Sequence, residues 1–460
     1  MQLPAPLLNF EQYLYWDDYT NHPNTIGCRI RLSGRVDEPA LKVSSEKALT
    51  MHPLLRTRLA VKGSRLRWSE VSDSPIIVRL EERFLTQPYV KKIDLSKEIG
   101  GQLHWASDGR NATLNFLMHH ATADGLGGLQ VVSDWMTAYA NETSLNHNSV
   151  STPKLAKVRR VDSDLLDSRG NHGFLSWKFL KKIPKQMIGL LGVWEFLRNR
   201  PVSLKPVSES EIVSEATVDD KVQPKSLRET YPGLETIEVG SIDELQTLAN
   251  KESVTANDLV LHNIFVGVAN WRRELEYGSD DDLLRIMVPM NLRTIRDRYL
   301  PAANKASLVS LDRKQAKCVA GKELLDSIRF QMNVIQNNDL GFTFLHMLGL
   351  YRWLPGGLQR IARKDRVGST VLVTNLGEPF KRTVLPKDQC GKVIVGDMRL
   401  EGFDLIAPLR PNTHAAFAIY RYADKLMISL TYNNRVISKQ EANRLGELVK
   451  IEIQQHLNTT

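Results

Sequence analysis

The chain has 460 residues, of which 42% are hydrophobic and 25% charged. That length exceeds what one hydrophobic core usually serves and predicts two domains, while the composition excludes a disordered chain. Its three cysteines, Cys28, Cys318 and Cys390, are far apart and show no CxxC spacing. This argues against a disulfide framework or a zinc site and favours a reducing compartment. The first residues lack the features of a signal peptide, so we expect a cytoplasmic protein.

Residues 1–150 predict a mixed α/β unit, because alternating apolar runs there give way to apolar residues at helical spacing. The predicted elements are strands at 25–32 and 112–119, a hairpin at 54–68 around Lys62-Gly63-Ser64, and helices at 38–51 and 125–140. The second predicted strand ends where the second predicted helix is about to begin. Any functional residues at that junction would lie on a short turn.

Residues 151–215 form a basic amphipathic stretch, and residues 216–460 predict a second α/β unit. The net charge of the chain is +9. Between Lys154 and Lys205, twelve basic residues stand against four acidic ones, so nearly all of the excess lies there. The predicted elements of the second unit are a helix at 259–274 capped by Asn257 and Asp258, strands at 283–290 and 370–373, a hairpin at 413–432, and a helix at 439–456.

The clearest chemical signal is the segment His119-His120-Ala121-Thr122-Ala123-Asp124-Gly125. Adjacent strand residues point to opposite faces, so both histidines can face one site only if the strand has already ended. This argues against a shared metal site and favours one catalytic imidazole beside one structural histidine. The alternative is a pair of core histidines at a strand end. Asp124 could bond the imidazole or hold the turn through an ion pair, and Gly125 would allow a substrate to approach closely.

Motifs of other enzyme classes are absent from the sequence. It contains no GxGxxG fingerprint, no P-loop, no HExxH and no GxSxG nucleophile elbow. No cysteine carries a local signature of nucleophilic catalysis. The sequence therefore gives no signal for covalent catalysis by serine or cysteine.

The HHxxxDG pattern resembles that of the chloramphenicol-acetyltransferase-like superfamily. This superfamily includes CoA-dependent acyltransferases, condensation domains of nonribosomal peptide synthetases, plant BAHD acyltransferases and polyketide-associated acyltransferases. Other resembling segments follow in the expected order: His52-Pro53-Leu54-Leu55-Arg56, Val288-Pro289-Met290-Asn291-Leu292-Arg293, Asn304, and Thr374-Asn375-Leu376-Gly377. The Asp-Phe-Gly-Trp-Gly motif of the plant branch is missing, and the nearest stretch is Gly402-Phe403-Asp404-Leu405.

The resemblance implies an α/β fold with two chloramphenicol-acetyltransferase-like sandwich lobes and an active-site channel between them. It implies that the second histidine, His120, is the general base, with Asp124 in the same motif acting mainly as a structural partner of Arg293. The remaining implied site residues are His119 and Gly125 as structural residues of the site, Arg56 as a structural residue, and Thr374 and Asn375 as contacts of substrate or oxyanion. No metal or cofactor is implied beyond a thioester co-substrate, acyl-CoA or carrier-bound.

The expected reaction moves an acyl group from a thioester, with acyl-CoA favoured, to the hydroxyl of a small-molecule or lipid acceptor. One alternative is condensation-type formation of an amide or ester, with the donor on an acyl carrier protein acting in trans. A second alternative is a non-catalytic binding protein on the same scaffold. We expect a monomer, and we find no nucleic-acid recognition motif.

Three readings of the basic stretch stay open. The simplest is a solvated linker with a lid helix. A second is a helix that lies on a membrane surface through residues 174–200, with its aromatic residues inserted. The third is docking of an acidic carrier protein or of the CoA phosphates.

Overall fold

The computed structural model describes residues 3, 5–62, 65–71, 75–146, 155–170, 189, 196, 198–206, 231–364 and 366–458. The chain folds into two compact units, and each contains three segments of sequence. The first unit consists of Met1–Gly170, Arg293–Lys305 and Leu376–Pro408. The second consists of Asn171–Leu292, Ala306–Asn375 and Leu409–Thr460. Two segments of the predicted C-terminal lobe thus belong to the first unit.

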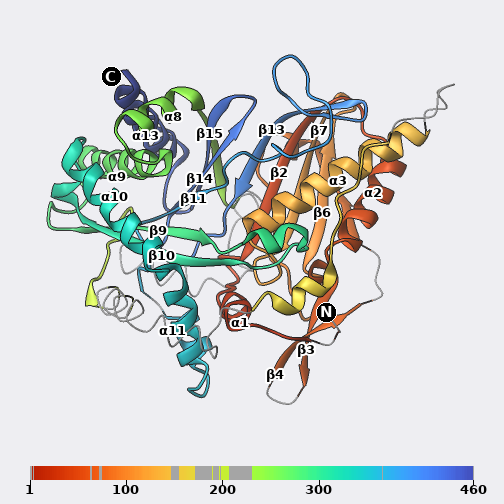
Figure 1. The fold of residues 1–460 in the computed structure, drawn as a ribbon, viewed down its shortest axis with the longest axis horizontal. Coiled ribbons are helices and arrows are strands. Elements are labelled where there is room, and N and C mark those ends of the chain that lie inside the picture. The colour runs from red at the N-terminus through yellow and green to blue at the C-terminus, as the bar shows by residue number, and fades with distance from the viewer. Residues whose placement is uncertain are drawn as a thin grey trace. The chain divides into compact units, whose positions relative to one another are not determined.

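The first unit is built on a six-stranded mixed sheet with the order β12-β13-β2-β7-β6-β5. Helices α2 and α3 pack against each other on this sheet (Figure 1). A smaller sheet has the order β1-β4-β3. The elements are β1 (Ala5–Pro6), α1 (Asn9–Trp16), β2 (Thr25–Ser33), α2 (Glu38–Thr50), β3 (Thr57–Lys62), β4 (Arg65–Glu70), β5 (Ile76–Arg79), β6 (Gly101–Ser107), β7 (Asn111–His119), α3 (Gly125–Asn146), β12 (Ile394–Val395) and β13 (Met398–Ile406).

Strand pairing explains why the first unit is discontinuous. β13 pairs antiparallel with β2, which joins residues almost four hundred positions apart. Leu405 and Cys28, for example, lie opposite each other in this ladder. The predicted boundaries followed the order of the sequence, whereas a long-range strand pair is set by side chains on both partners and leaves no local signal.

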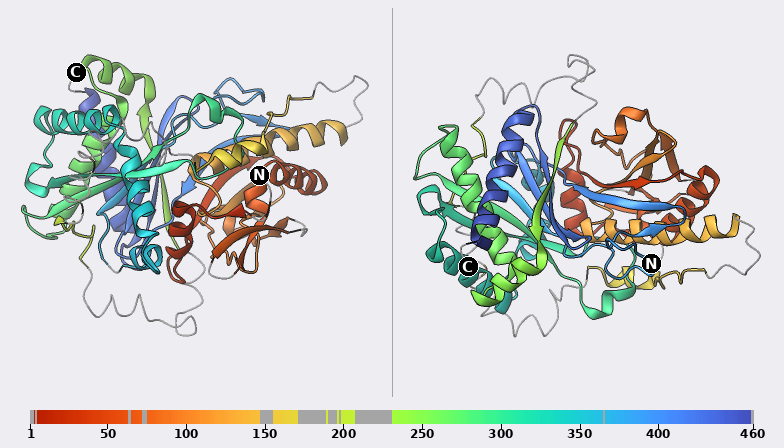
Figure 2. Two further views of the ribbon diagram at one scale, coloured as in Figure 1. Left: turned by 60° about the horizontal axis from the view of Figure 1, so that its bottom comes forward. Right: turned by 90° about the horizontal axis from the view of Figure 1, so that it is seen from above.

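The second unit has its own six-stranded sheet, with the order β10-β9-β11-β14-β15-β8. Helices α9 and α13 lie side by side on it (Figures 1 and 2). They approach so closely that a side chain at Gly267 would meet Val449. The elements are β8 (Gly233–Ser241), α8 (Ile242–Lys251), α9 (Ala256–Glu274), β9 (Leu283–Asn291), β10 (Ala306–Lys314), α10 (Lys322–Asn337), α11 (Thr343–Tyr351), α12 (Gly357–Ala362), β11 (Val371–Asn375), β14 (Ala415–Tyr422), β15 (Lys425–Tyr432) and α13 (Lys439–Asn458).

Most predicted helices and strands are present, with two local corrections. Helix α9 is capped by Thr255, whose hydroxyl accepts the N–H of Asp258 while the Asp258 carboxylate accepts the N–H of Thr255. The predicted caps, Asn257 and Asp258, therefore lie inside the first turn, because a reciprocal capping box satisfies more free N–H groups than either residue alone. The predicted hairpin at 54–68 begins only at Thr57, since Pro53–Arg56 forms a short 3-10 helix.

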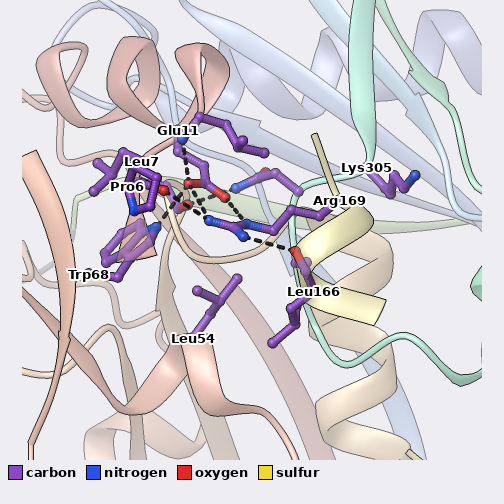
Figure 3. Close-up of polar contacts among 12 residues, drawn as sticks. Pro6, Leu7, Glu11, Leu54, Trp68, Leu166, Arg169 and Lys305 are labelled. Atoms are coloured by element: carbon purple, nitrogen blue, oxygen red, sulfur yellow. Dashed lines mark hydrogen bonds and ion pairs between the residues drawn. The ribbon is translucent and has the colours of Figure 1, made fainter. Parts of the chain in front are cut away.

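The beginning of the basic stretch is anchored in the first unit through a buried ion pair (Figure 3). Arg169 Nε lies 2.8 Å from Glu11 Oε1, and the Trp68 indole N–H donates to Glu11 Oε2 at 2.9 Å. Arg169 also donates to the carbonyl of Leu166 at 2.8 Å. Glu11 is fully buried, and a buried carboxylate is tolerated when its oxygens are paired in this way.

The end of the basic stretch is held in the second unit. Arg272 donates to the carbonyls of Ser203 and Leu204 at 2.7 and 2.8 Å, and Lys205 pairs with Glu441 at 2.8 Å. Residues 171–188, 190–195 and 197 lie outside the described residues, so the predicted lid and membrane-surface helix at 174–200 stay predictions. Among the described helices, none is long and apolar enough to cross a bilayer.

Candidate active site

The motif forms the turn between β7 and α3. His119 is the last residue of β7, and its N–H still bonds the carbonyl of Gly100 at 2.9 Å. The N–H of His120 instead donates to the carbonyl of Asn24 at 2.8 Å, outside the paired strands. Helix α3 then starts at Gly125. The strand thus ends between the two histidines, and the two side chains have different surroundings.

The His119 side chain is buried and bonds the backbone of the turn. Its side chain is 1% exposed, and Nδ1 accepts the N–H of Ala121 at 3.1 Å. The proton of the neutral ring must therefore sit on Nε2, 3.8 Å from the Asp18 carboxylate. Burial raises the pKa of Asp18, but its neighbours, His119 first and then the Asn24 N–H and Lys92, lower that pKa overall. These contacts fit the structural role predicted for the first histidine.

His120 has the arrangement that a general base needs. Its Nδ1 lies 3.1 Å from the carbonyl oxygen of Ala123. A carbonyl can only accept, so Nδ1 carries the proton and Nε2 presents a lone pair. Within the described part of the chain, no residue hydrogen-bonds Nε2. Burial lowers the pKa of His120 below its ordinary value of 6.5, so the ring is neutral and able to take a proton at neutral pH.

The carboxylate of Asp124 is fully used in holding the turn. Arg293 donates to both oxygens, at 2.7 and 2.8 Å, in a bidentate pair. The backbone N–H groups of Gly127 and Lys305 supply two further bonds, at 2.8 and 2.9 Å. Burial raises the pKa of Asp124, but Arg293 and these bonds lower it overall. Of the two roles left open by the sequence, the ion pair is the one observed, and it is the pair that the resemblance implies.

A second segment, Arg293–Lys305, holds the turn from outside it. The side-chain amide of Asn304 donates to the carbonyls of His120 and Ala121, at 2.7 and 2.9 Å. The carbonyl of Ala303 accepts from the Asp124 N–H at 3.4 Å and from Arg293 at 3.0 Å. This segment belongs to the same unit as the motif. Its contacts fix the backbone on both sides of the His120 ring.

A buried histidine, His52, bonds the backbone of this segment. His52 Nδ1 accepts the N–H of Ala302 at 2.9 Å, and its Nε2 lies 3.3 Å from Asp134, which pairs with Arg159 at 2.8 Å. The His52 side chain is fully buried. Burial lowers its pKa, although Asp134 opposes the shift. His52 is thus a neutral positioning residue. It connects α3, through Asp134, to the backbone of Ala302 in the segment that carries Asn304.

Glycines at the start of α3 allow this close packing, but Gly125 is not one of them. A side chain at Gly127 would lie 3.3 Å from the backbone of Ala303, and one at Gly128 would collide with Met118 and Cys28. At Gly125 an added methyl group would meet only ordinary contacts, the nearest at 3.5 Å. The described protein therefore gives no steric reason for glycine at position 125.

The remaining predicted residues lie elsewhere. Thr374 and Asn375 end β11 in the second unit, where the Asn375 side chain lies 3.3 Å from that of Asn257. Their contact with substrate or oxyanion stays a prediction. Arg56 is near the surface and bonds the Thr50 hydroxyl at 3.2 Å, which fits a structural role. The described residues contain no group of three or more metal-ligating side chains.

Sequence reasoning missed several residues that hold the site. Asn24, Ala303 and Lys305 act through backbone groups, so their side chains carry no signal in a single sequence. Asp134 lies within the helical pattern after the motif, where a buried carboxylate facing His52 has no local mark. A charged residue on the apolar face of a helix is the one feature that could have singled it out.

Comparisons with known sequences are limited. No protein-family profile matches the chain. Two uncharacterized proteins of Mycobacterium tuberculosis, from strains CDC 1551 and H37Rv, are each 23% identical over 278 residues. The alignments cover 57% of this chain and 56% of the relatives, so the chain spans about half the length of the curated relatives it matches.

Solved structures show the fold clearly. The first condensation domain of the calcium-dependent antibiotic synthetase, in complex with a substrate analogue, matches at TM-score 0.64 and 12% identity over 99% of this chain and 97% of that one. The starter condensation domain of rhizomide synthetase, in complex with C8-CoA and Leu-SNAC, matches at 0.64 and 12% over 98% and 94%. The condensation domain of the Monacolin K polyketide synthase matches at 0.60 and 12% over 99% and 97%. The chain has the condensation-domain fold, so the predicted α/β fold with two lobes is confirmed, while the channel between the lobes stays a prediction.

Proposed function

We propose that this chain is an acyltransferase in which His120 is the general base. The observation that carries the proposal is the state of this imidazole. Its Nδ1–H is committed to the Ala123 carbonyl, its Nε2 is unbonded among the described residues, and burial lowers its pKa. A neutral, fixed imidazole with one open nitrogen suits proton transfer at neutral pH. The condensation-domain fold supports the same chemistry by analogy.

In the proposed reaction, an acceptor hydroxyl lies against Nε2 and attacks the carbonyl carbon of a thioester. Nε2 takes the hydroxyl proton as the new carbon–oxygen bond forms. The tetrahedral intermediate then collapses, the carbon–sulfur bond breaks, and the imidazolium returns its proton to the leaving thiolate. The ester and the thiol are the products. The bonds from Asn304, Arg293 and Asn24 hold the imidazole in place, so little reorganisation is needed during the reaction. Thr374 and Asn375 remain the proposed oxyanion contacts.

For the donor we favour acyl-CoA. One structural neighbour was solved with C8-CoA, which supports an acyl-CoA donor on this fold. Carrier-bound thioesters are the second candidate, with amide or ester formation as in condensation domains, because the fold likeness covers almost the whole chain. That version requires an acyl carrier protein in trans. In both, the acceptor is a small molecule or a lipid and no metal takes part.

A thiol-release assay tests the proposal. Acyl-CoAs of graded chain length, and matching carrier-bound thioesters, would be offered with panels of alcohols and amines. We expect release with at least one donor class, and a loss of about 10²- to 10⁴-fold in His120→Ala, the usual contribution of a general base. His119→Gln is the matched control for the neighbouring ring. Equal release by wild type and His120→Ala would overturn the catalytic assignment.

The donor classes separate the two candidates. Release from acyl-CoA supports the stand-alone enzyme, and release from carrier-bound donors alone would shift the proposal to the condensation reaction. Ligand binding without release from either donor would instead support the non-catalytic binding protein.

A further inference from the structure

The end of α11 and the turn that follows it expose large apolar side chains. Leu350, Trp353 and Leu354 are exposed by 57%, 84% and 53% of their surface. Single exposed apolar residues are ordinary on protein surfaces, but three within five positions make a local patch. We call residues 350–364 the α11–α12 tip. Figure 1 shows the tip at the end of α11, a helix that packs against β10.

The tip is a well-formed turn. Gly356 has a φ of +65°, which a residue with a side chain adopts only under strain. A side chain at Gly357 would collide with the carbonyl of Tyr351. The N–H of Gly357 bonds the carbonyl of Leu354 at 2.8 Å, and the Arg360 guanidinium bonds the carbonyl of Pro355. These contacts fix the backbone, so Trp353 is held outward by the turn itself.

Basic residues lie close in sequence to the apolar patch. Between residues 340 and 366 five basic residues stand against one acidic residue, Asp365. The basic residues are Arg352, Arg360, Arg363, Lys364 and Arg366, and the first four are exposed. An exposed tryptophan with exposed leucines, in a segment rich in exposed arginine and lysine, is the composition of a segment that enters the headgroup region of an anionic bilayer.

We propose that the α11–α12 tip docks this protein on an anionic lipid surface. Trp353, Leu350 and Leu354 enter the interface between headgroups and acyl chains, while the basic residues contact the lipid phosphates. An acidic protein partner fits less well, because a specific protein interface usually needs about 20 to 30 residues a side, and the tip is smaller. A bilayer accepts a small projecting apex. Docking of this kind goes beyond acyl transfer and does not depend on which reaction the site performs.

Co-sedimentation with lipid vesicles tests the docking. The full chain would be mixed with vesicles of phosphatidylcholine alone or with roughly one third phosphatidylglycerol. We expect binding only to the anionic vesicles, weakened by salt. Trp353→Ala keeps every charge and should weaken binding about tenfold or more, because it removes the inserted ring. Arg363→Ala with Lys364→Ala should weaken binding similarly and reduce its salt dependence.

Phe330→Ala is the matched control. Phe330 on α10 is also an exposed aromatic residue, at 72%, but it lies outside the tip, so its removal should leave binding unchanged. Because the chain is basic overall, vesicle binding alone does not establish docking by the tip. If Trp353→Ala binds as tightly as wild type, or if Phe330→Ala loses as much, the proposal is wrong. Failure of wild type to bind anionic vesicles, with capture of an acidic carrier protein instead, would also overturn it.

Discussion

Each unit contains the same local arrangement: an antiparallel hairpin, a short turn, and a helix that packs back on the sheet. In the first unit this is β6, β7, residues 120–124 and α3. In the second it is β14, β15, residues 433–438 and α13. The two turns are held differently.

The second turn has several bonds among its own residues, beside one from the Asn433 N–H to the carbonyl of His414 at 2.8 Å. The carbonyl of Asn433 accepts from Val436 and Ile437, at 3.0 and 2.9 Å, and its side chain accepts from the N–H of Arg435 at 3.1 Å. Ser438 and Glu441 then cap α13 reciprocally. Short-range bonds of this kind close a turn locally.

The first turn depends on distant chain segments. Arg293 lies 169 positions after its partner Asp124, and Asn304 lies 184 positions after its partner His120. Asn24, which precedes the turn in the sequence, accepts the N–H of His120 through its carbonyl. Asn24 and Asn304 thus bond the backbone N–H and carbonyl of His120. Its ring bonds only through Nδ1 among the described residues, and Nε2 stays open. The first turn differs in the kind of outside support, a bidentate ion pair from Arg293 and the side-chain amide of Asn304.

Breaking the ion pair should have the largest effect. In Arg293→Ala the buried Asp124 carboxylate loses two charged bonds, and loss of one partner of a buried pair typically costs about 3–5 kcal/mol. We expect a large drop in the free energy of unfolding in urea, together with loss of activity. Arg293→Lys keeps the charge without the bidentate geometry and should recover part of the stability. Unchanged stability in Arg293→Ala would contradict the role given to the pair.

Removing one side-chain amide that bonds each turn should separate stability from activity. Asn304→Ala and Asn433→Ala each lose short hydrogen bonds and should each cost about 1–3 kcal/mol of folding stability. Only Asn304→Ala is expected to lower kcat per folded molecule, because only Asn304 contacts the carbonyl of His120. Parallel urea unfolding and steady-state kinetics would check this. An equal fall of kcat in both variants would show that the two turns do not differ in function.

The pH profile of kcat/KM should reflect the shifted histidine. The folded pKa of His120 lies below 6.5, because burial disfavours the charged ring. Activity should therefore persist below pH 6.5 and fall only as pH drops through the lowered pKa. The same shift makes stability full above pH 6.5 and weaker as pH falls, because the unfolded chain takes up the proton first. A half-maximal point above 6.5 would contradict the shift.

The sequence predicted the motif turn and most elements around it, because hydrophobic periodicity and the HHxxxDG spacing are local signals. It also placed Arg293 and Asn304 near the site, but only through their resemblance to known segments. It could not predict the support from Ala303, Lys305 and Asn24, whose backbone groups make the contacts. The sequence also could not predict that β13 belongs to the first sheet. Its pairing with β2 depends on side chains of two strands that are far apart in the sequence.

The smallest effect on stability is expected at Gly125, at the start of α3, where a single methyl group can be added. Gly125→Ala adds a side chain that meets only ordinary contacts, and replacing a helical glycine usually gains up to about 1 kcal/mol. Gly128→Ala would collide with Met118 and Cys28 and should lose about 1–3 kcal/mol. If substrate passes close to position 125, Gly125→Ala should fold well yet lower kcat/KM about tenfold or more. Full activity in that stable variant would mean that the glycine of the motif is not reserved for substrate.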